Sequence, residues 1–268
     1  MKKHQLLLLL LGCFMAAKPA HCAIPSTFHY VFGTNNTTDQ RVKRMKADTF
    51  FDSPLQIEFA EAVARSNTNQ MQRLLARGAD VNCQGHRGMR PLFWALINQS
   101  IPGVRFLLDY GADPNAKVTA KQPPADNALS LAAYLEEPQI LEELLKHGAN
   151  PNGPVTQWRK TALFTAAFYN QHKHISILLA NGANINWECS NGDTALHAAI
   201  RQSAYATALF LYRAGANPLI KTSYGDNSID SLKQFGGRLI LKRSDKAPYK
   251  QLCAELIKAG LLNESDVR

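Results

Sequence analysis

The chain has 268 residues, of which 46% are hydrophobic and 19% are charged. This composition excludes a disordered or collagen-like chain, and the length is enough for a hydrophobic core that needs no disulfide or metal. The formal net charge of +9 is a modest bias toward acidic partners or anionic surfaces.

The N-terminus has the pattern of an export signal. Lys2 and Lys3 precede the apolar run 6–11, an order typical of secretory signal peptides. The run is far shorter than the ~18 apolar residues of a membrane-spanning helix. Two processing sites fit: cleavage after Cys22, or acylation of Cys13 in the lipobox-like stretch 10–13 (LLGC). We therefore expect a signal peptide over residues 1–22 and a periplasmic protein, with a lipid anchor at Cys13, in the outer membrane, as the alternative.

Residues 23–54 contain no repeat and carry a cluster of four basic residues between positions 41 and 46. We interpret them as a solvated N-terminal extension, or tether. Removal of residues 1–22 takes away three lysines and no acid, which lowers the formal charge from +9 to +6. Because the protein is expected to leave the cytoplasm, nucleic acid is not expected as a partner.

A repeated motif follows. Residues 77–82 (RGADVN) recur as 110–115 (YGADPN), 147–152 (HGANPN), 181–186 (NGANIN) and 214–218 (AGANP), with a reduced copy at 258–260 (KAG). Their glycines are 33, 37, 34, 33 and 45 residues apart. A glycine followed by Asp or Asn is typical of a helix end that turns into a loop, because glycine adopts the left-handed conformation there at no steric cost.

A second motif begins 21 residues before four of these glycines. It reads RPLFWA at 90–95, NALSLA at 127–132, TALFTA at 161–166 and TALHAA at 194–199. The Thr or its substitute can cap a helix, and the small alanines allow close helix packing. Apolar ridges at 104–108 and 175–179 then predict a second helix in each unit.

The two linked motifs resemble those of the ankyrin-repeat family, T-P-L-H-x-A followed by L-L-x-x-G-A-D with a 33-residue period. The resemblance implies an all-α solenoid of about six helix–turn–helix repeats with hairpin fingers. The repeats are expected near 55–83, 84–116, 117–153, 154–187, 188–220 and 221–262, with a tail at 263–268. The third unit has extra residues in 117–126. The last unit has an insertion at 235–249, expected as a loop before a second helix at 251–258.

The resemblance also implies a protein partner on a concave face, formed by finger tips and by exposed positions of each first helix. Those helix positions are 97–98, 134–135, 168–169 and 201–202. Exposed aromatic clusters and arginines are typical of binding sites. We therefore expect the partner-binding residues to be Arg87, Met89, Tyr134, Leu135, Trp158, Phe168, Tyr169 and Arg201. The finger tips also offer His86, Arg159 and Trp187.

Catalytic motifs and phosphate-binding loops are missing from the sequence. His172 and His174 could be taken as a metal pair, but surface histidines at a helix start explain them better, because no cysteines or clustered acids complete a site. His197 is expected to make structural hydrogen bonds between neighbouring loops. The odd set Cys83, Cys189 and Cys253 predicts free thiols. No cofactor, metal or enzymatic activity is expected.

The sequence therefore predicts a monomeric, non-enzymatic scaffold in the bacterial cell envelope. Its expected role is to sequester or inhibit a protein partner such as a periplasmic toxin, as an immunity protein does. Three alternatives stay open: an accessory protein that supports a periplasmic enzyme in stress defence, a secreted host-directed effector, and an enzyme whose chemistry lies in the C-terminal insertion.

Overall fold

The computed structural model describes residues 46–117, 127–154, 158–236 and 243–267. The backbone divides into residues 1–44 and residues 45–268, and all described residues belong to the second unit. The expected signal peptide, Cys13, and the basic residues Arg41, Lys43 and Arg44 lie outside the described residues.

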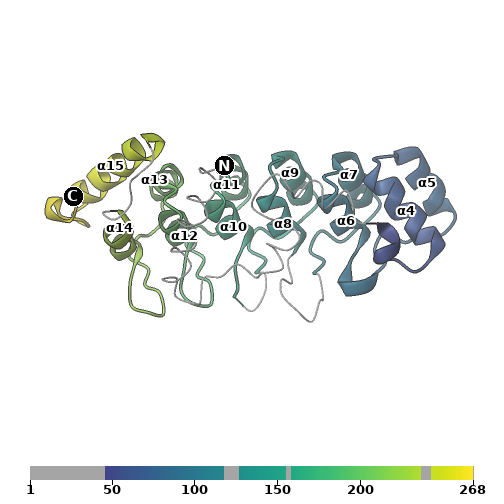
Figure 1. The fold of residues 1–268 in the computed structure, drawn as a ribbon, viewed down its shortest axis with the longest axis horizontal. Helices are drawn as coiled ribbons and strands as arrows, with labels where there is room; N and C mark the ends of the chain where they lie inside the picture. The colour runs from purple at the N-terminus through teal and green to yellow at the C-terminus, as the bar shows by residue number, and fades with distance from the viewer. Residues whose placement is uncertain (1–45, 118–126, 155–157, 237–242, 268) are drawn as a thin grey trace, which may run out of the picture. The chain divides into compact units, whose positions relative to one another are not determined.

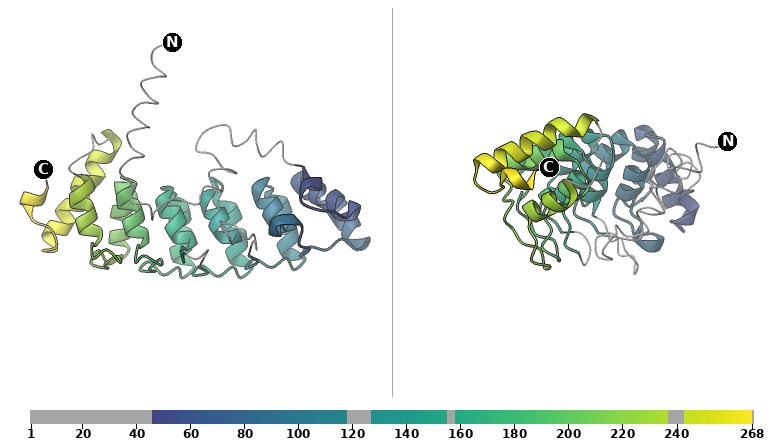
Figure 2. Two further views of the ribbon diagram at one scale, coloured as in Figure 1. Left: turned by 60° about the horizontal axis from the view of Figure 1, so that its bottom comes forward. Right: turned by 60° about the vertical axis from the view of Figure 1, so that its left-hand side comes forward.

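Six helix pairs make up the second unit, in two rows (Figure 1). The first helices of the pairs are α4 (Pro54–Ala64), α6 (Pro91–Ile97), α8 (Ala128–Tyr134), α10 (Ala162–Phe168), α12 (Ala195–Arg201) and α14 (Ser228–Gly236). The second helices are α5 (Thr68–Ala76), α7 (Ile101–Asp109), α9 (Pro138–Lys146), α11 (His172–Ala180), α13 (Tyr205–Arg213) and α15 (Arg243–Lys258). Successive first helices pack on one another, and Figure 2 shows the pairs standing side by side. The predicted all-α repeat solenoid is confirmed.

The helix ends follow from local sequence. The side chain of Asn127 accepts the amide of Ser130 at 2.8 Å, and the Thr161 hydroxyl accepts the amide of Phe164 at 3.4 Å. These bonds satisfy amides that lack a partner inside the helix. At the C-terminus of α7, Gly111 has φ +84° and the next amide bonds back to Leu107 at 2.8 Å. The glycine prediction is therefore correct, and the capping prediction is correct for Asn127 and Thr161 but not for Arg90, whose side chain makes no capping bond.

The core lies between the two rows of helices. The paired alanines Ala132 and Ala133 in α8, and Ala166 and Ala167 in α10, have no exposed surface. Each second helix inserts buried leucines toward them, such as Leu144 in α9. Because small side chains in the first helices let backbones approach, no single pair buries its apolar face alone, and stacking supplies the core.

The asparagines that end the first three copies of the glycine motif connect one repeat to the next. Asn115 donates from its Nδ2 to the carbonyl of Gly148 at 3.0 Å and accepts the amide of Asn150 at 2.8 Å. Asn82 and Asn152 make the same pair of bonds one repeat earlier and one later. We call this series the asparagine ladder. Its members repeat with the period of the fold, so it fixes the register between neighbouring repeats.

The fingers are also bonded to one another. Ser190 donates its amide to the carbonyl of Trp158 at 2.8 Å, and Ser223 donates to Asn191 at 2.9 Å. The fourth, fifth and sixth fingers therefore form a connected row rather than a set of independent loops.

The N-terminal boundary differs from the sequence prediction. Residues 23–54 were expected to be a tether, but Phe50 and Phe51 are buried, and a 3-10 helix η2 (Ala47–Thr49) packs on α4. The amide of His86 donates to the carbonyl of Phe50 at 2.7 Å, so residues 46–53 occupy the place of a preceding finger. A Cβ at Gly85 would lie 2.1 Å from that carbonyl oxygen, which explains the glycine.

The C-terminal insertion also differs from the prediction. It was expected to be a loop over 235–249 before a helix at 251–258, yet α15 begins at Arg243 and is 16 residues long. The insertion thus lengthens the last helix. Its Tyr249 is buried against Tyr205 of α13, with ring centroids 4.9 Å apart. The extra residues add apolar contact to the open end of the stack. Beyond α15, a 3-10 helix η4 (Glu264–Asp266) lies in the expected tail.

Candidate functional site

Three aromatic side chains meet at the C-terminal ends of α8 and α10. The rings of Tyr134 and Tyr169 are 4.6 Å apart at 79°, and those of Phe168 and Tyr169 are 5.2 Å apart at 69°. All three side chains are half-buried. We call these three residues the aromatic patch. Edge-to-face contacts hold the rings in place, so the patch presents preformed apolar surface at the boundary of two repeats.

The hydroxyl group of Tyr134 in the aromatic patch is partly buried. Burial, with a smaller effect from the Glu136 carboxylate, raises the pKa of Tyr134 above its ordinary value. The phenol is therefore neutral near neutral pH.

Leu135 is a correction. It was expected to be exposed beside Tyr134, but only 5% of its surface is accessible. Its backbone is extended, with ψ 159°, whereas the equivalent Tyr169 has ψ 8°. This change of backbone conformation at the helix end directs the leucine into the core. Ile97, which was also expected to be exposed and corresponds to Tyr134 in the second repeat, is buried as well.

Arg201 lies in an ion-pair network and not at an open surface. Its guanidinium is 2.8 Å from the carboxylate of Asp193 and 3.3 Å from that of Asp226. Burial of Asp226 opposes ionisation, but a hydrogen bond from Thr222 and the charge of Arg201 outweigh it and lower the pKa of the carboxyl group. Since Asp226 belongs to the next finger, Arg201 joins repeats five and six, and we assign it a structural role.

The other predicted residues lie on the fingers. Arg87 is exposed and has φ +57°, and Met89 is half-buried with its carbonyl bound to the amide of Gly85 at 2.8 Å. Trp158 is half-buried in the fourth finger. The structure thus unites Tyr134, Phe168 and Tyr169, places Arg87, Met89 and Trp158 on fingers, buries Leu135, and pairs Arg201 with two carboxylates.

Arg159 and Trp187, which the sequence offered as finger-tip residues, make a contact between the fourth and fifth fingers that the sequence did not predict. The guanidinium carbon of Arg159 is 5.2 Å from the ring centroid of Trp187. The indole Nε1 of Trp187 donates to the carbonyl of Arg159 at 2.8 Å. Arg159 is exposed and has φ +52°. The sequence does mark Arg159 as unusual: it lies three residues before the first residue of α10, and the same position in other repeats is occupied by Gly88, Gly192 and Gly225.

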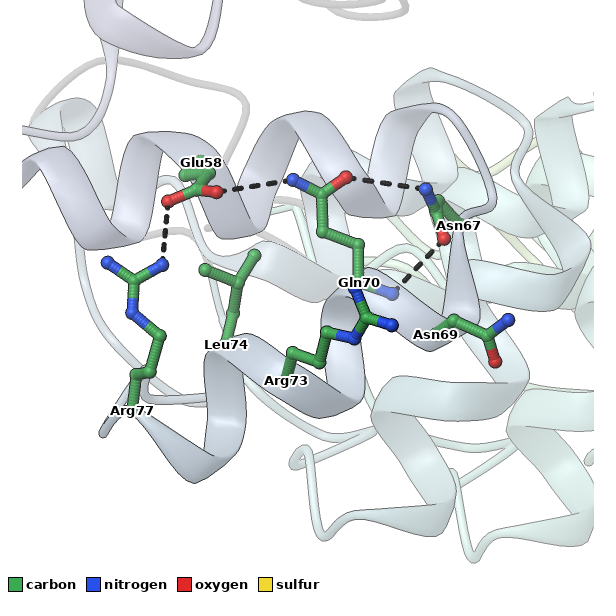
Figure 3. A pocket seen from close by; sticks show the side chains of 7 residues that line it. All are labelled: Glu58, Asn67, Asn69, Gln70, Arg73, Leu74 and Arg77. Atoms are coloured by element: carbon green, nitrogen blue, oxygen red, sulfur yellow. Dashed lines mark hydrogen bonds and ion pairs between the residues drawn. The ribbon is translucent and has the colours of Figure 1, made fainter.

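A shallow polar pocket lies on the first repeat (Figure 3). Its side chains form a chain of hydrogen bonds from Arg77 to Glu58 at 3.2 Å, from Gln70 to Glu58 at 3.3 Å, and from Asn67 to Gln70 at 3.3 Å. Arg73 also lines it. Because the described residues contain no helix pair before α4 and α5, we interpret this polar surface as the solvent-facing end of the stack.

The histidines have different surroundings from those expected. His174 is buried, with 1% of its surface accessible, so the expectation of a surface histidine is wrong. Burial lowers its pKa. His197 is also buried, and its Nδ1 lies 3.2 Å from the amide of Thr194, which is the N-cap of its own helix and not a neighbouring loop. The residues that the structure describes contain no group of three or more metal-binding side chains.

The cysteines of the described residues are not joined in disulfides: Cys83, Cys189 and Cys253 all keep their thiols. Burial, together with the Asp80 carboxylate, raises the pKa of Cys83 to about 11. Its thiol is therefore protonated and unreactive near neutral pH.

Among the described helices, none is both long enough and apolar enough to cross a membrane.

Stacked helix pairs, a connected row of fingers and a preformed aromatic patch define a repeat scaffold for protein partners. A family model described as "Ankyrin repeats (3 copies)" matches residues 50–118 and 129–222. The chain belongs to the ankyrin-repeat family, and it is a protein–protein interaction scaffold. Members of this family are generally binding modules without catalytic activity.

Similar proteins differ widely in length. Protein PhlB of Serratia liquefaciens is 31% identical over 178 residues, which cover 66% of this chain and 76% of PhlB. The mitochondrial disaggregase of Homo sapiens is 30% identical over 198 residues, 71% of this chain but 26% of the disaggregase. The Caenorhabditis elegans protein mask-1, which contains ankyrin repeats and a KH domain, is 29% identical over 167 residues, 62% of this chain and 6% of mask-1. The match thus spans a small part of both eukaryotic proteins.

Proposed function

We propose that the chain binds one protein partner through the aromatic patch, on a concave face shared by the first helices and fingers, and that it does so in a bacterial cell envelope. The observation that supports this site is the ring cluster of Tyr134, Phe168 and Tyr169, which stays half-exposed although it sits in the middle of the stack. Desolvated aromatic side chains at the centre of an interface contribute most of the binding free energy in many complexes.

The cellular role in this proposal is to sequester or inhibit the partner, for example a periplasmic toxin. The basic and apolar start of the sequence supports export. A bacterial relative that aligns over 76% of its own length supports a bacterial setting for this arrangement of repeats. The absence of catalytic motifs in the sequence favours binding over chemistry.

The test is a capture experiment in the cells that naturally make the protein. The tagged full chain is recovered from the envelope fraction, and its bound partner is identified and purified. Its affinity is then compared for the wild type and the variant Tyr134→Ala/Phe168→Ala/Tyr169→Ala. We expect about a 100-fold loss, because several hot-spot side chains are removed together.

The matched control is Tyr110→Ala. Tyr110 is an aromatic residue with 48% of its surface exposed, and it lies at the end of α7, in the other row of helices. We expect this change to alter affinity less than about 3-fold. A triple variant that keeps its helical circular dichroism and also keeps full affinity would contradict the site. The identity of the partner separates a toxin from an envelope enzyme, and recovery only from host cells would support an effector.

A further inference from the structure

Arg159 occupies a backbone position that other repeats reserve for glycine. Three residues before the first residue of the following helix, the second, fifth and sixth repeats have Gly88, Gly192 and Gly225, with φ of +72°, +78° and +84°. Arg159 adopts φ +52° at this position. A side chain with a Cβ is disfavoured there, and strained residues of this kind concentrate at functional sites. Glycine meets the backbone requirement of the fold at this position, so the presence of an arginine must be explained by its side chain.

The side chain is held in a defined place. Its guanidinium carbon is 5.2 Å from the centroid of the Trp187 ring, while the Trp187 indole bonds to the carbonyl of the same arginine at 2.8 Å. The neighbouring backbone bond from Ser190 to Trp158, 2.8 Å long, fixes the two fingers to each other. Arg159 is therefore a preorganised cation and not a freely moving one.

The charge of Arg159 is not used inside the described part of the protein. Some other exposed arginines are paired with carboxylates: Arg105 lies 2.6 Å from Glu143, and Arg213 lies 2.5 Å from Glu255. Arg159 has no carboxylate partner among the described residues. The next residue on the same finger, Lys160, is a second cation with a defined contact: its ammonium lies 5.2 Å from the ring centroid of Phe164. Two ordered cations on one finger fit a negatively charged ligand.

We propose that Arg159, held over Trp187, binds a carboxylate side chain of the protein partner. This inference rests on the proposed function and gives its partner an acidic residue at the fourth and fifth fingers. A guanidinium held over an aromatic ring by a cation–π contact still has N–H groups to donate, and their fork matches the two oxygens of a carboxylate. The family's use as a protein-binding scaffold favours an acidic protein segment over a polyphosphate such as nucleic acid.

The test uses NMR and needs no knowledge of the partner. The full chain, labelled with nitrogen-15, is titrated with acetylated tetraglutamate amide while the indole N–H resonance of Trp187 is followed. The resonance is assigned with a Trp187→Phe variant. Tetraglutamine serves as the neutral peptide, and an oligothymidylate with the same charge serves as the phosphate probe. We expect a saturable shift with tetraglutamate and none with tetraglutamine.

Two variants separate recognition from simple charge. Arg159→Lys keeps the charge but loses the planar fork, and Arg159→Gly restores the residue type of the other fingers. We expect both to raise the dissociation constant for tetraglutamate at least 5-fold. We also expect the Arg159→Gly variant to keep its unfolding midpoint within about 3 °C, because relief of backbone strain offsets the lost ring contact.

Several results would overturn the inference. These are no saturable shift with tetraglutamate, equal affinity in the lysine variant, or tighter binding of the oligothymidylate. If Arg159→Gly unfolds far below the wild type, the lysine variant, which keeps the long side chain, still decides the question. The aromatic-patch variant should bind tetraglutamate like the wild type. A failure of the proposed patch therefore leaves this test intact, and a failure of this test leaves the patch intact.

Discussion

Single residues in this protein are informative where they depart from the repeat. Leu135 has the position of an exposed residue, but an extended backbone at the end of α8 buries it. Arg159 has the position of a glycine, but its guanidinium lies over a tryptophan ring. The departure at Leu135 is not visible in residue type, because it depends on backbone angles, whereas the glycines of the other repeats mark the departure at Arg159. The sequence therefore identified Tyr134, Phe168 and Tyr169 correctly as neighbours, and it could not distinguish Leu135 from them.

His174 provides a prediction at the scale of one side chain. It is 1% exposed, and neither ring nitrogen has a hydrogen-bond partner in the described structure. Burial lowers its pKa in the folded protein, whereas in the unfolded chain the imidazole has its ordinary pKa of about 6.5. As the pH falls through that value, the unfolded state takes up a proton that the folded state does not. The free energy of unfolding must therefore decrease, by at most about 1.4 kcal/mol per pH unit for each proton.

We expect His174→Leu to reduce this decrease between pH 7 and pH 5, as measured by urea unfolding at each pH. The buried His197, whose pKa is also lowered by burial, retains part of the dependence in the variant. The comparison at pH 8 is the control, because the imidazole is neutral in both the folded and the unfolded state there. Above pH 8, the free energies of unfolding of the variant and the wild type should therefore differ by a constant amount. An unchanged slope between pH 7 and pH 5 would show that His174 is solvated or paired in solution.

At the scale of the elements, sequence reasoning performed best inside the repeats and worst at their ends. Glycines such as Gly111 and Gly148 mark the C-terminal ends of the second helices, because the chain needs a residue in the left-handed backbone conformation there and this need is local. The ends of the stack have no such local requirement. Phe50 and Phe51 join the core because the first repeat leaves one side uncovered, and α15 starts early because Tyr249 can pack on α13. Both outcomes depend on neighbours that are distant in sequence.

The asparagine ladder gives a prediction for the junctions between elements. Asn115→Ala removes two inter-repeat hydrogen bonds, to Gly148 and from Asn150. The site is exposed, so water replaces part of the loss, and we expect a destabilisation of about 1 kcal/mol in urea unfolding. The control is Leu219→Ala, which lies at the same place in the fifth motif and is 50% exposed. Its effect should be within about 0.5 kcal/mol. Equal effects of the two changes would refute a bonding role for the ladder.

At the scale of the whole molecule, the two ends of the stack are closed differently from its interior. The first repeat ends in the polar chain of Arg77, Glu58 and Gln70, while the last repeat is covered by the long helix α15. Such end units shield the apolar surfaces that interior repeats share with their neighbours. The finger row and the aromatic patch lie between these ends, so the candidate binding surface is built on the most constrained part of the chain.

Export is tested on the intact protein. We expect the protein purified from its natural cells to lack the N-terminal residues, either starting at Ala23 or starting at a lipid-modified Cys13. Intact-mass spectrometry distinguishes the two forms, because the second keeps ten more residues and adds the acyl chains. A Cys13→Ser variant is the control, since it blocks acylation but leaves cleavage after Cys22 available. An unprocessed chain beginning with Met1 would reject export by this signal.

The asparagine ladder also bears on how such a protein can change its length. Asn82, Asn115 and Asn152 make the same two bonds to the repeat that follows. A duplicated unit inserted between them would therefore find matching donors and acceptors on both sides. A copy added after the fifth repeat would meet Leu219 where the motif requires an asparagine. Gene duplication can thus lengthen this chain from within, and its two closed ends would be inherited unchanged.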